Sequence, residues 1–434
     1  MAAEAGVGEV AHLGDGWVVL GRLDASRACA PGSKAPRTRM RRPNVSRPQR
    51  SDATTDVLHV CFGGLGGHPG VVGPLDAALH RRGISTLVVR YAPADQLADA
   101  AGWAALPTAT VVVKHGRLDL RGLVELGRVV RTVAPRVVLC HTASAAAPAF
   151  FGQLAAGRRP RVGLVEHQAV GLRSRSDQLS SFSALAFVQR IAVLSTDYAR
   201  RYPLRRAPFR KARQLSIVPS GIDLEAFCPA PGEQSPVGER ARVLGMTCRL
   251  IPTKDVATLL RSLALARQEL GDRAALRLRI AGDGPDRPAL ERLIDELELT
   301  DAVDLVGTLD EEGIIAFLQG LDVYVQSTLG ETGATAVLQA YAVGLPVIAS
   351  DVEGVRDIVR DGVDGILVAA SDPVALAEQL CGLLLDPERL ARLGAAARQR
   401  AERDFGAEAM AGRYLEFLAR IDPDGPWQQA LVAR

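Results

Sequence analysis

Short apolar runs alternate with amphipathic stretches along most of the chain. The runs lack strict in/out alternation, which is typical of strands covered on both faces in a parallel sheet. In the first half, the expected strands are Val57–Phe62, Thr86–Arg90, Val111–Val113, Val137–Cys140, Gly163–Glu166, Ile191–Leu194 and Leu215–Val218. In the second half, they are Arg242–Met246, Leu276–Ala281, Val303–Val306, Asp322–Gln326, Leu345–Ala349 and Ile366–Val368.

The stretches between these strands repeat apolar residues at helical spacing, as in Val256–Leu270 and Leu290–Leu297. A Pro- and Gly-rich linker at residues 229–240 separates the two series of strands and helices. We therefore predict an α/β protein with two Rossmann-like, doubly wound domains, residues 56–228 and 241–405, facing each other across a ligand-binding cleft. Residues 406–434 are expected to form a helix that packs back on the first domain, followed by a tail.

Residues 1–55 differ in composition from the rest of the chain. Between Lys34 and Arg50 there are seven basic residues, three prolines and no acid. Such a segment buries too little apolar surface to offset its ordering entropy, so we predict a disordered basic extension. A basic arm for an anionic surface, or a start of translation at Met40, are alternatives.

Composition narrows the class of protein. The 434 residues include 52 basic and 49 acidic side chains, a balance that predicts no nucleic-acid partner. The six cysteines form no C-x-x-C pair, which favours reduced thiols in the cytosol. No apolar run is long enough to span a bilayer and no secretory signal is present, so a cytoplasmic protein is expected.

A basic cluster in the first half supports a second hypothesis, peripheral contact with the inner membrane face. Its cations surround Tyr202, Leu204 and Phe209, a composition that suits docking on anionic lipid. A solvated helix and loop is the alternative. The cluster comprises Arg200, Arg201, Arg205, Arg206, Arg210, Lys211 and Arg213.

Residues with the chemistry of an anion site follow the strands of the second half. Arg249 and Lys254 lie between a strand and a helix, where two cations and the helix dipole suit a diphosphate. Gly282 and Gly284 end the next strand and allow close approach of the backbone, although an ordinary tight turn explains them equally well. Gly307 ends a third strand, where exposed backbone could bind a nucleobase.

The segment around Glu331 is the most informative. Glu331 precedes a helix whose free N–H groups come from Gly333, Ala334 and Thr335, and Gln339 lies eight positions further on. That separation is up to ~12 Å along a helix, comparable to the span from a hexose past a diphosphate to a ribose. The alternative is a common acid near a helix N-cap. Residues 351–365 are expected to form a helix and a turn with a structural role.

Together these motifs resemble family-4 retaining glycosyltransferases of the GT-B fold, also called glycosyltransferase group 1, over residues 57–418. In the second half, the similar segments are Arg249–Lys254, Gly282–Pro285, Glu331–Gln339 and Ala342–Asp351. In the first half, they are Gly63–Gly67, Pro135–His141, Val165–His167 and Val218–Asp223.

The resemblance implies transfer of a hexose-type sugar from a nucleotide-diphosphate sugar to the hydroxyl of a glycan, a lipid-linked acceptor or a small molecule. A UDP- or GDP-sugar is the expected donor, with retention of configuration and with no metal or cofactor. Glu331 and His141 are the implied catalytic residues, and Arg249 and Lys254 neutralise the diphosphate. The implied acceptor side contains Gly66, Gly67, His68 and His167. Gln339 stands where the family has a second acid.

Other functions fit less well. A dinucleotide-binding oxidoreductase is excluded because Pro69 replaces the third glycine of its motif and Arg90 replaces its acid. A nucleotide-sugar epimerase of the same fold and a non-catalytic sugar-nucleotide-binding module remain as alternatives. His68, His141 and His167 lack metal-ligand spacing, and the one D-x-D, at 422–424, lies in the tail, away from the mid-chain position of GT-A enzymes.

Overall fold

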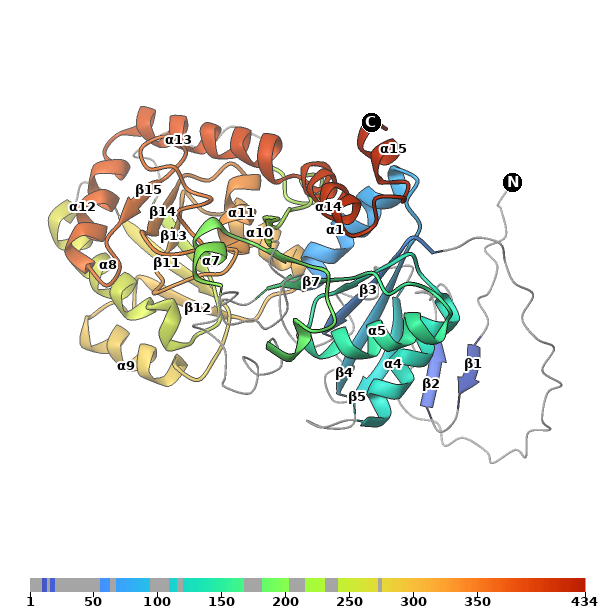
Figure 1. The fold of residues 1–434 in the computed structure, drawn as a ribbon. Helices are drawn as coiled ribbons and strands as arrows, with labels where there is room; N and C mark the ends of the chain where they lie inside the picture. The colour runs from blue at the N-terminus through green and yellow to red at the C-terminus, as the bar shows by residue number, and fades with distance from the viewer. Residues whose placement is uncertain are drawn as a thin grey trace, which may run out of the picture.

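The structure is a computed structural model dominated by two parallel sheets with helices on both faces (Figure 1). A short antiparallel pair, β1 (Val10–Leu13) and β2 (Gly16–Val19), lies near the N-terminus. The structure describes residues 10–13, 16–19, 55–62, 68–93, 109–114, 120–167, 182–202, 215–230, 241–271 and 275–433.

The first large sheet has seven parallel strands in the order β5-β4-β3-β6-β7-β8-β9. These are β3 (Val57–Phe62), β4 (Thr86–Pro93), β5 (Ala109–Lys114), β6 (Val137–Cys140), β7 (Val162–Glu166), β8 (Arg190–Val193) and β9 (Leu215–Ile217). The helices are α1 (His68–Arg81), α4 (Leu120–Val133), α5 (Ala146–Ala155) and α7 (Thr196–Arg201). All seven strands expected here are confirmed.

The second sheet has six parallel strands in the order β12-β11-β10-β13-β14-β15. These are β10 (Arg242–Thr247), β11 (Leu276–Ala281), β12 (Val303–Gly307), β13 (Val323–Gln326), β14 (Val347–Ser350) and β15 (Ile366–Val368). The helices are α8 (Val256–Leu270), α9 (Arg287–Glu296), α10 (Glu311–Gln319), α11 (Thr335–Ala342), α12 (Pro373–Leu384) and α13 (Pro387–Arg400). The expected strands, and the helix at Val256–Leu270, are confirmed.

Alternate strand residues of the first sheet pack against two different helical layers, as the two-residue period of a strand requires. Leu58 and Val60 belong to a buried cluster that includes Leu126 of α4. Val57 and Leu139 belong to another that contains residues of α1 and of the C-terminal helix. Burial on both faces explains why these strands read as apolar runs.

The end of the chain returns to the first sheet. After a π-helical turn at Ala401–Phe405, α14 (Ala407–Ile421) lies beside α1, and α15 (Trp427–Val432) follows it (Figure 1). Apolar side chains of α14, among them Phe417, pack in the same cluster as Val57. The fully buried Asp422 pairs with Arg136 at 3.2 Å and with Arg161 at 2.6 Å. The D-x-D of the tail is thus part of a structural tie to the first sheet.

Two local expectations differ from the structure. The predicted extension at residues 1–55 did not include the β1–β2 pair, and most of its other residues lie outside the described ones. The helix predicted within residues 351–365 is wrong: this segment forms consecutive turns. Gly354 has φ +82°, which no α-helix accommodates, and the Asp364 carboxylate accepts the backbone N–H of Arg360 at 2.8 Å.

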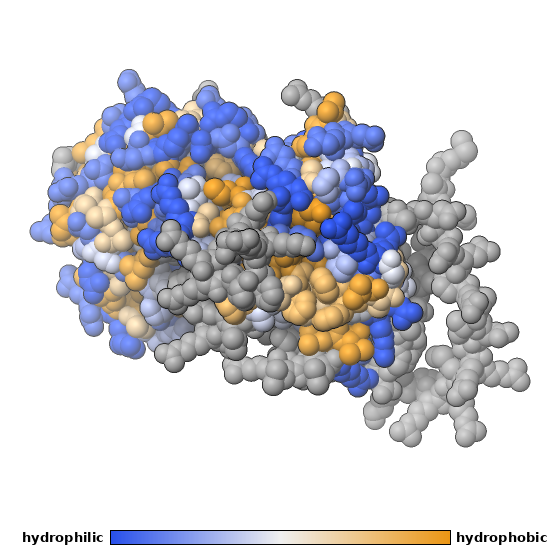
Figure 2. Space-filling model, viewed as in Figure 1, coloured by the Kyte–Doolittle hydropathy of each residue, from blue (hydrophilic) through white to orange (hydrophobic). Residues whose placement is uncertain are grey.

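The surface carries both polar and apolar regions. Figure 2 shows apolar side chains gathered over α4 and α5, where Val124, Phe151 and Leu154 are each more than half exposed. Among the described residues, no helix is long and apolar enough to cross a membrane.

Candidate functional site

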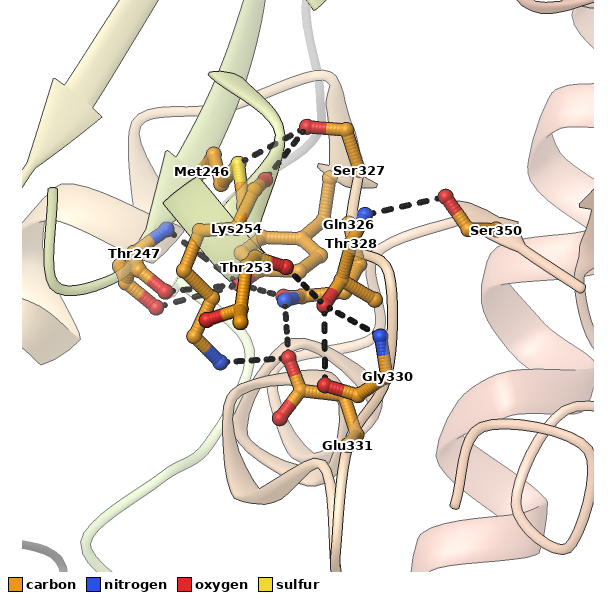
Figure 3. A network of polar contacts seen from close by, with 11 residues as sticks. Met246, Thr247, Thr253, Lys254, Gln326, Ser327, Thr328, Gly330, Glu331 and Ser350 are labelled. Carbon is orange, nitrogen blue, oxygen red and sulfur yellow. Dashed lines mark hydrogen bonds and ion pairs between the residues drawn. The ribbon is translucent and has the colours of Figure 1, made fainter. Parts of the chain in front are cut away.

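An ion pair between Lys254 and Glu331 lies beyond the carboxyl ends of β10 and β13, which are adjacent in the sheet (Figure 3). The Lys254 Nζ donates to Glu331 Oε1 at 2.5 Å, and the two side chains are 21% and 11% exposed. Lys254 ends a 3₁₀ turn, Pro252–Lys254, before α8. Strand order therefore brings together two predicted site residues that are 77 positions apart.

A chain of hydrogen bonds from strand β13 orients the Glu331 carboxylate. The Gln326 Nε2 donates to Glu331 Oε1 at 2.9 Å, and the Tyr324 hydroxyl donates to Gln326 Oε1 at 2.8 Å. Burial raises the pKa of Tyr324, so its hydroxyl remains a proton donor. Because Tyr324 donates to the Gln326 Oε1, the amide group of Gln326 is held with its Nε2 towards Glu331. The Glu331 carboxylate therefore accepts an N–H from Gln326. Sequence reasoning missed Gln326, whose signal is a polar residue closing an apolar strand.

Hydrogen bonds between two short loops fix the positions of Lys254 and Glu331 relative to each other. The Thr328 Oγ1 donates to the carbonyl of Thr253 at 3.0 Å, and the Leu329 N–H donates to the same carbonyl at 2.9 Å. The Ser327 hydroxyl donates to the Lys254 carbonyl at 3.2 Å, and Ser350 of β14 accepts the Thr328 N–H (Figure 3). The segments that carry Lys254 and Glu331 are therefore directly bonded to each other.

The predicted glycines after β11 approach protein backbone. A Cβ at Gly282, which has φ +131°, would lie 1.8 Å from the carbonyl oxygen of Cys248. A Cβ at Gly284 would lie 2.3 Å from the carbonyl oxygen of Leu250. The backbone at both glycines therefore packs closely against the loop that carries Arg249, which leaves no room for a side chain at either position. Gly307, with φ +85°, receives the Gly282 N–H at its carbonyl at 2.7 Å.

Arg249 itself is exposed and forms no ion pair within the described part of the chain. Its neighbour Cys248 has its pKa raised to about 12, chiefly by burial, with Lys254 lowering and Glu331 raising it. The thiol is therefore protonated at neutral pH. The guanidinium of Arg249 and the ammonium of Lys254, which is paired with Glu331, thus both follow the end of β10. Cys248, between β10 and Arg249, carries no charge.

The start of α11 follows Glu331. Ala334 precedes the helix with φ +35°, and the Leu338 N–H is bonded to the Ala334 carbonyl. The amides of Gly333, Ala334 and Thr335 thus precede the regular helical bonds. A Cβ at Gly333 would lie 2.9 Å from Leu194, just after β8 of the first sheet. Gln339 is half-buried on the same helix.

Residues 351–357 connect Glu331 to the first sheet. The Glu331 N–H donates to the Glu353 carbonyl at 3.0 Å, and the Glu353 side chain pairs with Arg201 of α7 at 2.9 Å. The Asp357 carboxylate accepts the Thr196 N–H of α7 at 2.5 Å. This segment, which we expected to be structural, is in direct contact with the candidate site.

Gly354 occupies a special position within that segment. It has φ +82°, and a Cβ there would lie 2.1 Å from the Glu331 carbonyl oxygen and 2.6 Å from its carbonyl carbon. Both its backbone conformation and the space around it therefore require glycine.

On the first sheet, His141 and His167 follow adjacent strands β6 and β7. The His141 Nδ1 lies 2.8 Å from His167 Nε2, and His141 is 4% exposed. His68 begins α1, but its side chain and the residues Gly66 and Gly67 lie outside the described ones. Among the described residues, no group of three or more His, Cys, Asp or Glu side chains is arranged to hold a metal ion.

Most of the predicted membrane-contact cluster, residues 203–214, also lies outside the described residues, so that hypothesis stays a prediction. Arg201 and Arg200 are described, and they pair with Glu353 and Asp197. Tyr202 was expected on the surface, which is wrong. It is 7% exposed because its hydroxyl donates to the buried Glu166 at 3.0 Å.

Comparison with known sequences finds a family match in the second half of the chain. Residues 233–400 match the family model of glycosyl transferases group 1. A D-inositol 3-phosphate glycosyltransferase from Thermobispora bispora is 34% identical over 225 residues, 48% of this chain and 52% of the relative. Another, from Salinispora tropica, is 32% identical over 289 residues, 62% of this chain and 56% of the relative. The chain spans about half the length of these curated relatives.

Comparison with solved structures covers both sheets. The structure of HepE from Anabaena in complex with UDP-glucose has a TM-score of 0.69 at 18% identity, covering 84% of this chain and 99% of that one. This likeness confirms the predicted fold class, two Rossmann-like domains of the GT-B type.

Proposed function

We propose that the protein is a nucleotide-sugar-dependent glycosyltransferase, because residues 233–400 match the family model of glycosyl transferases group 1. The reaction moves a hexose-type sugar from a UDP- or GDP-sugar to an acceptor hydroxyl, with retention of configuration and without a metal ion. The HepE complex with UDP-glucose and the relatives named for an inositol phosphate supply the first donor and acceptor to test.

The pairing of Lys254 with Glu331 is the observation that carries this proposal. Each group compensates the charge of the other at a distance of 2.5 Å. A donor diphosphate competes for Lys254 because a charge-assisted bond to a phosphate oxygen replaces the bond to the carboxylate. Glu331 is then released to accept hydrogen bonds from the sugar hydroxyls, while Gln326 keeps the carboxylate in place.

The groups around the pair complete a donor site. Arg249, exposed at the adjacent loop, adds a second cation for the diphosphate. The amides before α11 offer donors to a phosphate at a helix N-terminus. We assign the ribose diol to Gln339, further along α11. The chemical contribution of this set is preorganised stabilisation of the leaving diphosphate, which is often the largest catalytic term.

The test measures release of UDP or GDP from a panel of UDP- and GDP-hexoses, with inositol phosphates and short glycans as acceptors. We expect donor- and acceptor-dependent release that persists in EDTA, and a product whose anomeric configuration, read by NMR, matches the donor. Lys254→Met is expected to lower kcat/KM by about 10²–10³. Arg267→Gln, which removes a cation paired with Asp301 on the surface, is the matched control and should leave kcat/KM unchanged.

The possible results separate the alternatives. Donor binding without turnover on any acceptor would favour the non-catalytic module, and interconversion of donor epimers would favour the epimerase. Absence of binding to any nucleotide sugar would refute the proposal.

A further inference from the structure

Three histidine rings form a continuous chain inside the first domain. The Nδ1 of His59, on β3, lies 3.1 Å from the Nε2 of His141, and the Nδ1 of His141 lies 2.8 Å from the Nε2 of His167. Successive ring centroids are 5.4 and 5.1 Å apart, with 26° between the planes in both pairs. Both nitrogens of His141 therefore face other imidazoles.

The sheet places these rings together. Strands β3, β6 and β7 are neighbours in the sheet. The backbone N–H of His141 donates to the backbone carbonyl of Val60 at 2.8 Å. In each strand, the histidine is two positions from a residue of the cluster that contains Val57, Leu139 and Val165, so all three lie on the face covered by α1. His59 is fully buried, His141 is nearly so, and His167 is half-buried.

Counting protons limits the states of this chain. Each nitrogen–nitrogen contact holds one proton, and a neutral imidazole has one N–H. A neutral chain therefore has two states: all three protons on Nδ1, or all three on Nε2. They differ in whether the terminal His59 Nε2 bears a hydrogen. Taking up an extra proton, with both contacts intact, also puts a hydrogen on that nitrogen.

The environment of the His59 Nε2 discriminates between these states. This atom is buried and, within the part of the chain that the structure describes, has no hydrogen-bond partner. The nearby Asp76 is occupied by the Thr86 hydroxyl and lies 3.7 Å from the Nδ1 of His80, so its carboxylate is already engaged. A buried N–H without an acceptor is costly and rare in proteins. Burial also lowers the pKa of His59 to about 4, with opposing effects from Asp76 and His80, which keeps it neutral.

We infer that His59 is a positioning residue that makes the side-chain N–H groups of His59 and His141 point towards His167. His141 and His167 then both carry their single proton on Nδ1. His167, the most exposed member, then acts as a fixed hydrogen-bond donor. The inference rests on the proposed function only in that the oxygen His167 meets belongs to the hydroxylated acceptor.

The same arrangement prevents the histidines from serving as a proton acceptor. Any proton taken from the acceptor hydroxyl would place a hydrogen on the buried Nε2 of His59. The acceptor proton therefore leaves by a route that does not pass through these histidines. His59 thus acts through His141 without itself touching substrate.

Tautomers are measured directly by long-range ¹H–¹⁵N NMR of the full chain with ¹⁵N-labelled histidine. We expect His141 and His167 to show a protonated Nδ1 and a pyridine-like Nε2, with no conversion to imidazolium as pH falls to about 6, near the ordinary histidine pKa. A protonated Nε2 on neutral His141, or an imidazolium signal above that pH, would overturn the inference.

Substitutions at position 59 test the cause. His59→Leu removes the donor and should leave His141 as a mixture of tautomers; retention of the single Nδ1–H form would show that His59 does not set it. His59→Asp places an acceptor near the former Nδ1 and should reverse both tautomers. His80→Leu is the control, because His80 lies near His59 but outside the chain, and should change neither spectrum.

Steady-state kinetics provide an independent test of the inference. His59→Leu should raise the acceptor KM by up to about tenfold, the value of one neutral hydrogen bond, and leave the donor KM unchanged. The NMR result needs no turnover, so the inference and the proposed glycosyltransferase activity fail separately.

Discussion

Replacing Gly354 by alanine tests whether the backbone contact with Glu331 sets the position of its carboxylate for the proposed reaction. The new Cβ would lie 2.1 Å from the Glu331 carbonyl oxygen, and real Cβ contacts are essentially never closer than 3.0 Å, so this backbone must move by about 0.9 Å. A displacement of about 1 Å can cost 10²-fold in rate. We expect Gly354→Ala to lower kcat/KM for nucleotide-sugar turnover by about a hundredfold, measured by initial rates of nucleotide release.

Gly362 supplies a matched control on the same segment. Its φ is +71°, but no atom of the described residues lies within 4 Å of a Cβ built there. Gly362→Ala therefore experiences the left-handed strain, about 1–2 kcal/mol, without the collision. Both variants should melt a few degrees below the wild type, and only Gly354→Ala should lose activity. Equal activity of the two variants, whether high or low, would refute the steric argument.

Three further outcomes are expected. Glu331→Gln frees Lys254 and should tighten binding of UDP alone about two- to fivefold by calorimetry while turnover falls, because the competing carboxylate is gone; weaker UDP binding would contradict this. Asp422→Asn removes the buried charge that pairs with Arg136 and Arg161 and should cost about 2 kcal/mol of unfolding free energy in urea, less than a fully buried pair because the two arginines are 29% and 23% exposed; an unchanged midpoint would count against it. Because burial raises the Cys248 pKa to about 12, its iodoacetamide labelling at pH 8, followed by mass spectrometry, should be at least about a hundredfold slower than that of a free thiol and accelerate as pH rises.

The strands were predictable because burial on both faces makes a parallel strand uniformly apolar. Their ends were less so: β4 continues to Pro93, beyond the apolar run that ended at Arg90. The helix expected in residues 351–365 shows a different limit. Val355, Ile358 and Val359 recur at helical spacing and are buried, but the φ of Gly354 turns the chain first. Periodicity reported burial correctly and backbone conformation wrongly.

The candidate site was predictable as a set of residue types rather than as a set of contacts. Lys254 and Glu331 were expected near one ligand, but their direct pairing depends on the adjacency of β10 and β13. Gln326 ends one apolar strand and His59 lies inside another, and the contacts of such a polar residue cannot be predicted until its tertiary partner is known. Gly282 was expected to approach a ligand, whereas its close neighbour is the Cys248 carbonyl.

Glu331 is positioned by both halves of the molecule at once. From within the second sheet, Gln326 and Lys254 hold its carboxylate. Its backbone is bonded to Glu353, whose side chain pairs with Arg201 in the other half. The pair with Arg201 is largely exposed on the arginine side and therefore worth at most about 1 kcal/mol, too little to lock the halves together. A weak link of this kind suits the proposed function, in which the site opens to exchange substrates, because it transmits the position of one half to Glu331 without preventing its movement.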